Sequence, residues 1–81
     1  MLGSPVDLTT REYQLLLIFA QNPNDVLSRQ QLLDLVWGID YAGDDRVVDV
    51  FVKRLRQKLG HDREKWAIVT IRGMGYKFKV E

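Results

Sequence analysis

The 81-residue sequence contains no cysteine and a single histidine. Without cysteine the chain can form neither a disulfide nor a thiolate zinc site, and its composition fits a reducing compartment, the cytoplasm. It also has no HExxH, GxSxG or phosphate-binding glycine loop, so local motifs supply neither a nucleophile–base pair nor a metal site. The sequence therefore predicts a protein that is not an enzyme and that uses no cofactor or metal.

Long apolar runs are missing as well. The longest uninterrupted run covers residues 15–20, whereas a helix needs about 20 apolar residues to span a bilayer. The first residues lack the basic and apolar regions of a signal peptide, and residues 1–4 are interpreted as an expression remnant. We therefore expect one soluble domain, residues 1–81, with one core and no membrane partner.

Each half of the chain is poor in charge of one sign. Residues 1–45 hold two basic and seven acidic residues, whereas residues 46–81 hold ten basic and four acidic ones. The formal net charge of +1 thus hides a division into −5 and +6. This asymmetry predicts a basic working surface in the second half that is suited to a polyanion.

Residues 46–59 have the periodicity of an amphipathic helix. One side of the helix is apolar and consists of Val48, Phe51, Val52, Leu55 and Leu59. The other side is largely cationic or hydrogen-bonding and consists of Arg46, Asp49, Val50, Lys53, Arg54 and Gln57. A solvated helix face is the simpler interpretation of such a pattern, but the segment that follows favours a binding surface. Residues 68–80 predict two short strands around a turn that carries Arg72 between glycines.

Two further helices are predicted ahead of residue 46. Capping-box patterns at residues 9–12 and 28–31 mark their starts, and Pro23 and Gly38 mark their ends. The core positions expected of the first are Tyr13, Leu16, Leu17 and Ala20, widened by Leu15, Ile18 and Phe19, and those expected of the second are Leu32, Leu33, Val36 and Trp37.

The order of these elements predicts an α+β fold. Either Asp44 or Asp45 is expected to cap the third helix, and Gly60 to end it. Residues 25–27 can form a very short strand. A helix pair with a short connection, followed by a hairpin, is a winged helix-turn-helix: three helices with a C-terminal β-hairpin wing.

Several motifs together resemble the C-terminal DNA-binding domain of bacterial two-component response regulators of the OmpR/PhoB type. In chain order they are Leu8-Thr-x-Arg-Glu-Tyr-x-Leu-Leu16, Ser28-Arg-x-x-Leu32, Val36-Trp-Gly38, Arg46-x-Val-Asp-Val50, Leu55-Arg-x-Lys-Leu59 and Thr70-Ile-Arg-Gly-x-Gly-Tyr-Lys-Phe78. The resemblance implies sequence-specific binding of double-stranded DNA, with residues 46–59 as recognition helix in the major groove and residues 68–80 as wing in the minor groove. It further implies contacts between loop 38–45 and RNA polymerase, and a tandem dimer on DNA.

The sequence departs from this family at its front. Members usually carry about four antiparallel strands before the first helix and a phosphorylatable receiver domain. By analogy only residues 5–8 remain of that sheet, so the N-terminal sheet is largely absent. Regulation by phosphorylation is thus implied by the resemblance and is not encoded in these 81 residues.

Side chains on the polar side of residues 46–59 are candidates for reading base edges, because about 21 Å of helix can present three or four of them to a major groove. Arg54 is the first choice, since a guanidinium pairs bidentately with guanine. Asp49 is expected to accept from a cytosine amine, to orient Arg46 or Lys53, or simply to pair with Lys53. Val47 and Val50 can touch a thymine methyl or fill the core rim, and Arg72 is expected in the minor groove. The complete set of proposed base contacts is Val47, Asp49, Val50, Lys53, Arg54 and Arg72.

A second set of side chains suits phosphates. Arg46 and Arg56 lie toward the flanks of the helix, and Ser28 and Arg29 begin the helix before it, where simple capping is the equal alternative. The complete set of proposed phosphate contacts is Ser28, Arg29, Trp37, Arg46, Arg56, Thr70 and Tyr76. For Trp37, which packs in the core with its indole N–H reaching outward, the phosphate contact is implied by the resemblance. Tyr76 can also serve cross-strand packing.

Two other binding functions are weaker. A protein-interaction module would need an apolar, weakly charged third helix, and this helix carries Arg46, Lys53 and Arg54. RNA binding is disfavoured because the deep A-form groove does not admit a helix and no paired stacking aromatics are expected on a sheet face.

Overall fold

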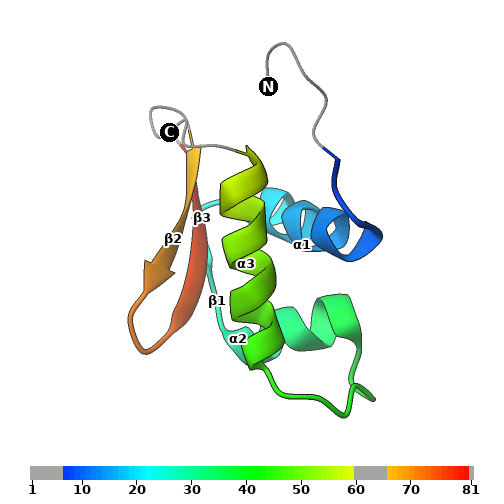
Figure 1. Ribbon diagram of the computed structural model, residues 1–81. Helices are drawn as coiled ribbons and strands as arrows, with labels where there is room; N and C mark the ends of the chain where they lie inside the picture. Colours follow the sequence, from blue (N-terminus) through cyan, green and yellow to red (C-terminus); the bar gives the residue numbers. More distant parts are fainter. Residues whose placement is uncertain (1–6, 60–65, 81) are drawn as a thin grey trace.

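The computed structural model describes residues 7–59 and 66–80, with helices packed beside a small antiparallel sheet (Figure 1). The elements in chain order are α1 (Thr10–Gln21), β1 (Val26–Leu27), α2 (Arg29–Leu32), η1 (Leu33–Trp37), α3 (Arg46–Leu59), β2 (Trp66–Ile71) and β3 (Gly75–Val80). Because η1 follows α2 without a break, the two form one helical segment. The predicted arrangement of three helices and a C-terminal hairpin is confirmed.

Helix α1 starts at the predicted capping box. The Thr9 hydroxyl accepts from the Glu12 amide at 3.2 Å, and the Glu12 carboxylate accepts from the Thr9 amide at 2.9 Å. The helix ends after Gln21, one residue before Asn22-Pro23.

The predicted core face of α1 was partly wrong. Leu15 and Phe19 are buried, but Tyr13, Leu17 and Ala20 are exposed. Residues 13–20 are almost continuously apolar apart from Gln14, so their periodicity did not determine which side of the helix packs inward. The true face also includes Glu12, one turn before Leu15.

The segment α2–η1 also begins with a capping box, in which the Ser28 hydroxyl accepts from the Gln31 amide at 3.0 Å. Its predicted core is confirmed, with Leu32, Leu33 and Val36 buried and Trp37 half-buried. The change to π-helical hydrogen bonding after Leu32 was not predicted. Gly38 ends the segment with a φ of +100°, a conformation that favours glycine.

Helix α3 spans the predicted residues. The Asp44 carboxylate accepts from the Arg46 amide at 3.0 Å, which identifies Asp44 as the side-chain cap. Its apolar side is also confirmed, since Val48, Val52 and Leu55 are buried and Phe51 and Leu59 pack against the core. The predicted stop, Gly60, lies outside the described residues.

Strand β3 is central in the three-stranded sheet, between β1 and β2. The hairpin register pairs Ile68 with Phe78 and Ile71 with Gly75. A Cβ added to Gly75 would lie 2.1 Å from the Leu27 carbonyl oxygen, so the close approach of β1 requires glycine there.

The strand predicted at residues 5–8 is not found. Asp7 and Leu8 are outside any strand, because no neighbouring strand pairs with them in the described part of the chain, and Pro5 and Val6 lie outside it. Leu8 instead packs against the core, and the Asp7 carbonyl accepts from the Lys58 ammonium at 2.9 Å.

An ion pair joins the start of α1 to the end of α3. Glu12 is 1% exposed, and its carboxylate accepts from the Lys58 ammonium at 2.7 Å. Burial raises the pKa of Glu12, but hydrogen bonds from Lys58 and Thr9 and the Lys58 charge outweigh it, so the pKa is lowered.

No helix within residues 7–59 and 66–80 has the length and apolar character needed to cross a bilayer.

Candidate nucleic-acid interface

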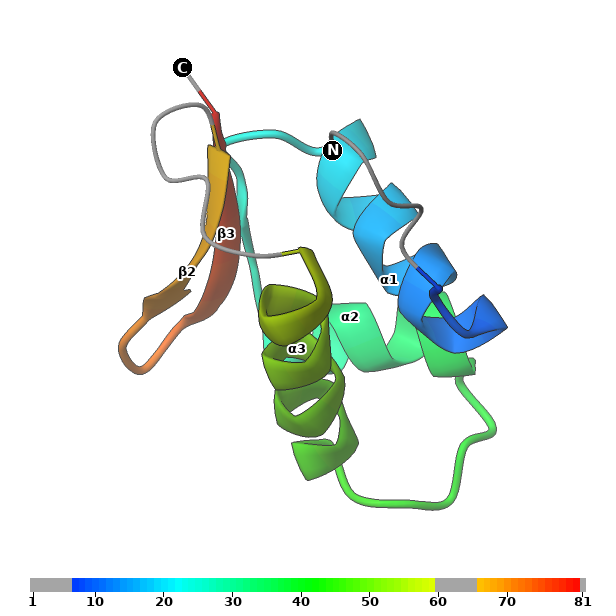
Figure 2. The same ribbon diagram turned by 45° about the horizontal axis from the view of Figure 1, so that its top comes forward.

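Helix α3 stands between the hairpin on one side and α1 and the α2–η1 segment on the other (Figures 1 and 2). The side of α3 that faces away from the core carries the exposed side chains of Arg46, Val50, Lys53, Arg54 and Gln57. We call these five residues the outer face of α3. Its exposure follows from burial of the apolar stripe on the opposite side of the helix.

The candidates for base readout differ in their surroundings. Arg54 is exposed, and its guanidinium carbon lies 5.0 Å from the centroid of the Phe51 ring, a cation–π distance. Lys53 and Val50 are exposed, whereas Val47 is half-buried and packs against the core. Val47 thus contributes to the core rim, while Arg54, Lys53 and Val50 are accessible to a ligand.

Asp49 does not pair with Arg46 or Lys53, so those two interpretations were wrong. Its Oδ1 atom accepts from Arg29 Nε at 3.0 Å and from the Tyr76 hydroxyl. Arg46 instead pairs with Asp44, with Nε 3.2 Å from Oδ2. Asp49 lies at the edge of the outer face that is turned toward α2 and β3. It therefore bonds to Arg29 and Tyr76, which are distant in sequence, and not to its helical neighbours.

This contact changes the electrostatics of both donors. Burial raises the pKa of Tyr76, and the hydrogen bond and negative charge of Asp49 raise it further. The Asp49 charge likewise raises the pKa of Arg29. Arg29 therefore stays protonated, and Tyr76 remains a neutral hydroxyl whose single O–H donates to Asp49.

Arg56 lies against the wing. Its Nε donates to the Ile68 carbonyl at 2.9 Å, its Nη2 donates to the Thr70 hydroxyl at 3.0 Å, and its guanidinium carbon lies 5.7 Å from the Tyr76 ring centroid. These contacts tie α3 to β2 and β3. Sequence reasoning missed them, because the partners follow Arg56 by 12 and 14 residues and no local pattern links them.

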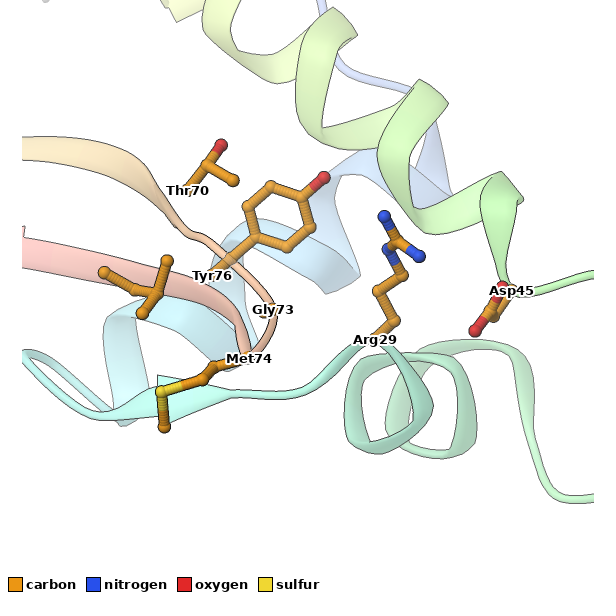
Figure 3. Close-up of a pocket in the computed structure, with 8 residues that line it drawn as sticks. Arg29, Asp45, Thr70, Gly73, Met74 and Tyr76 are labelled. Carbon is orange, nitrogen blue, oxygen red and sulfur yellow. The ribbon is translucent and has the colours of Figure 1, made fainter.

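A pocket of about 280 Å³ lies between the start of α2, the start of α3 and the wing (Figure 3). It is lined by Arg29, Asp45, Thr70, Ile71, Gly73, Met74, Gly75 and Tyr76. The tips of the Arg29 and Tyr76 side chains converge beside α3. Three of the predicted phosphate contacts, Arg29, Thr70 and Tyr76, therefore meet at one place.

The remaining predicted residues lie elsewhere. Arg72 is exposed in the turn between β2 and β3. The Ser28 hydroxyl is engaged in the α2 cap, and Trp37 is half-buried with its ring edge-to-face on Phe51 at 5.1 Å between centroids. Met74 is 61% exposed on the pocket wall and was not predicted there. Its position between Gly73 and Gly75 in the turn could have indicated that its side chain is exposed.

The described residues contain no cluster of three or more histidine or carboxylate side chains that could hold a metal ion. The described residues do bring together a cation and hydroxyls at the pocket, which can bind an anion. The exposed polar side chains of α3 present hydrogen-bond donors beside it. This combination suits phosphates flanked by base edges.

Comparison with known proteins gives matches over nearly the whole chain. The family model described as "Transcriptional regulatory protein, C terminal" matches residues 3–78. The transcriptional regulatory protein CseB of Streptomyces coelicolor is 54% identical over 77 residues, which are 95% of this chain and 31% of that protein. The chain thus spans about a third of the length of the curated relatives it matches.

Solved structures agree with this match. The DNA-binding domain of Bacillus subtilis CssR has a TM-score of 0.81 and 42% identity, over 94% of this chain and 82% of that one. The DNA-binding domain of Klebsiella pneumoniae RstA, solved in complex with the RstA box, has a TM-score of 0.78 and 37% identity, over 95% of this chain and 77% of that one.

Proposed function

We propose, because this chain belongs to the OmpR/PhoB-type family of transcriptional regulatory C-terminal domains, that it binds double-stranded DNA sequence-specifically as the effector domain of a two-component regulator. It would act in the bacterial cytoplasm, where that DNA is. The observation that carries the proposal is the cationic outer face of α3 beside a wing whose turn exposes Arg72. The similarity to an RstA domain solved with its DNA box supports it.

In this proposal α3 enters the major groove. Arg54 pairs with a guanine, Lys53 donates to an acceptor edge, and Val50 touches a thymine methyl, with Val47 contributing from the core rim. Arg54 is suited to this because its ring contact with Phe51 restricts the guanidinium without using its hydrogen-bond donors. Asp49, the remaining candidate for base contact, instead uses its Oδ1 atom to accept from Arg29 and Tyr76.

The wing enters the adjacent minor groove, where Arg72 meets the negative potential that is strongest in narrow A·T-rich segments. Phosphate contacts hold the two elements in place. Those we propose are Ser28, Arg29, Trp37, Arg46, Arg56, Thr70 and Tyr76. Arg29 and Thr70 have the best support, because they share one pocket between the helices and the wing, whereas the single O–H of Tyr76, on the same pocket, donates to Asp49.

Titration with duplex DNA, single-stranded DNA and RNA at two salt concentrations tests the proposal. We expect duplex DNA to bind most tightly, and its affinity to fall on the order of a hundredfold between roughly 50 and 200 mM salt as condensed counterions are released. Binding that prefers RNA or single strands, or that hardly changes with salt, would contradict it.

We further propose that loop 38–45 contacts RNA polymerase. Ile39 is 86% exposed and Leu35, just before the loop, is 58% exposed, so a hydrophobic surface is available there. The change Ile39→Ser should weaken binding of polymerase to the DNA-bound domain while leaving DNA affinity unchanged. Equal polymerase binding by both proteins would remove the loop from the proposal.

Tandem binding to direct repeats, the last element of the proposal, is supported by the family alone. Analytical ultracentrifugation with one-repeat and two-repeat duplexes should give one and two bound domains, with tighter binding to two repeats. A single domain on both duplexes would exclude it.

A further inference from the structure

Asp49 occupies a position that ought to weaken DNA binding. It lies in the first turn of α3, beside the outer face, and a carboxylate there repels DNA phosphates. In the structure its charge is compensated, because Arg29 and the Tyr76 hydroxyl both donate to its Oδ1 atom. The acid is therefore a shared acceptor for two side chains of the proposed interface.

The contact joins three elements. Arg29 begins α2, Asp49 belongs to α3, and Tyr76 belongs to β3. Arg29 and Tyr76 lie 20 and 27 residues away from Asp49 in the sequence. A free arginine side chain samples many rotamers, so an acceptor that restricts it reduces the entropy lost when it binds a ligand.

The geometry leaves Arg29 able to bind a further anion, whereas the single O–H of Tyr76 is already donated to Asp49. Arg29 uses its Nε atom for Asp49, and among the described residues its two terminal amines have no other hydrogen-bond partner. Half of the side chain is exposed, at 51%. Arg29 and Tyr76 both line the pocket that also holds the Thr70 hydroxyl, which is roomy enough for a phosphate group (Figure 3).

We propose that Asp49 is a positioning residue for DNA binding: together with Tyr76 it holds Arg29 in the arrangement that binds a backbone phosphate, and it does not itself read a base. The inference rests on the proposed DNA-binding function and assigns a role within that site. It reverses the simple electrostatic expectation, under which loss of this carboxylate strengthens binding.

The change Asp49→Asn tests the sign of the effect. It keeps the size of the side chain but removes its charge, so Arg29 and Tyr76 lose their strong acceptor. We expect duplex affinity to fall on the order of tenfold, equally on a preferred and on a scrambled duplex. Affinity equal to or above that of the unchanged protein would overturn the proposal, and so would a loss confined to one base pair, which would make Asp49 a base contact.

The matched control is Asp45→Asn. Asp45 lines the same pocket and its change removes the same charge, but it makes no hydrogen bond to Arg29 or Tyr76 within the described residues. DNA binding by this variant should be unchanged or stronger. A tenfold loss here as well would show that any nearby charge change has this effect, and the specific role of Asp49 would be refuted.

A double-mutant cycle separates positioning from general loss of structure. In a background of Arg29→Ala, Asp49→Asn should cost at most about twofold, because the main side chain that it positions is already gone. An undiminished tenfold loss in that background would contradict the proposal. Unfolding curves of both variants, measured in parallel, identify any loss that arises from instability.

A measurement without DNA distinguishes failure of this inference from failure of the proposed function. The Tyr76 ring resonances followed by NMR through alkaline pH report its ionisation, and Asp49→Asn should lower the pKa of Tyr76, while Arg29 and Arg56, whose charges also act on it, remain. If the unchanged domain binds no duplex, the proposed function fails. If the Tyr76 pKa does not move, the Asp49 contact itself is refuted.

Discussion

Arg54 and Arg56 stand two positions apart on α3 but differ in what they contact. The Arg54 guanidinium lies over the Phe51 ring and is otherwise exposed. Arg56 is half-buried and donates two hydrogen bonds to β2. The same residue type therefore presents an accessible guanidinium at one position and connects the helix to the wing at the other.

We predict that removing Arg54 changes sequence preference, whereas removing Arg56 changes only the overall affinity for DNA. Arg54→Ala should relax sequence preference at one or two base pairs and cost about 1–3 kcal/mol on a preferred duplex. Arg56→Ala should weaken binding to all sequences alike, since it removes a cation and loosens the wing. Affinities for a duplex selected from a random pool and for its scrambled version measure the contrast. Equal losses on both duplexes for both variants would show that Arg54 does not read bases.

Glu12 gives a prediction on stability and pH. Because its folded pKa is lowered from the ordinary 4.5, its contribution is present above pH 4.5 and is lost as the pH falls through the folded value. Glu12→Gln should therefore lower the free energy of unfolding by roughly 1–3 kcal/mol at pH 7, and the difference should shrink below pH 4.5. Urea unfolding of both proteins from pH 7 to pH 3 measures this; a difference independent of pH would contradict the assigned pKa direction.

At the scale of elements, sequence patterns predicted the features that depend on neighbouring residues alone. The bounds and apolar side of α3 followed from its periodicity, and two capping boxes set the starts of α1 and α2. The inward side of α1 did not follow, because an almost continuous apolar run has no single best face. The π-helical turn of η1 (Leu33–Trp37) was not predicted either, because its apolar spacing is that of an ordinary helix.

The same division holds for the candidate site. Residue types and helical spacing were enough to predict the exposed outer face of α3 and the exposed Arg72. The contacts of Asp49 with Arg29 and Tyr76, and of Arg56 with the wing, join elements far apart in sequence. They could not be predicted because they depend on how α2, α3 and the hairpin pack together, which the pattern within each element leaves open.

For the wing we predict a dependence on flanking sequence. Arg72→Ala should weaken binding most on duplexes with an A·T-rich segment beside the major-groove site, where a narrow minor groove concentrates negative potential, and little on G·C-rich flanks. Titrations of both proteins against the two flank types measure it. Lys79 is exposed on β3 outside the turn, and Lys79→Ala is the control whose effect should not depend on the flank. If Arg72→Ala weakens binding equally on both flanks, Arg72 is a phosphate contact.

At the scale of the whole molecule, one pair of exposed apolar side chains lies apart from the basic surface. The basic residues gather in the second half of the chain, while α1, on the far side of α3 from the hairpin (Figure 2), exposes Tyr13 and Leu17 one turn apart. Such a pair is a small apolar patch away from the proposed DNA surface.

This separation predicts that self-association and DNA binding can be changed independently. The double change Tyr13→Glu and Leu17→Glu should lower any concentration-dependent association of the domain, measured by sedimentation, without changing its DNA affinity by more than about twofold. The opposite pattern, unchanged sedimentation with impaired DNA binding, would place part of the DNA surface on α1.

The hydrogen bonds from Arg56 to the wing have one more consequence. They join α3 to the hairpin before any DNA is bound, so we predict that binding depends on the helical phase between the two parts of the DNA target. One base pair inserted between the major-groove bases and the A·T-rich flank would rotate the two by about 35°. The unchanged domain should bind such a duplex more weakly although every contacted base is still present. For Arg56→Ala, whose affinity is lower on every correctly spaced sequence, the further loss caused by the insertion should be smaller.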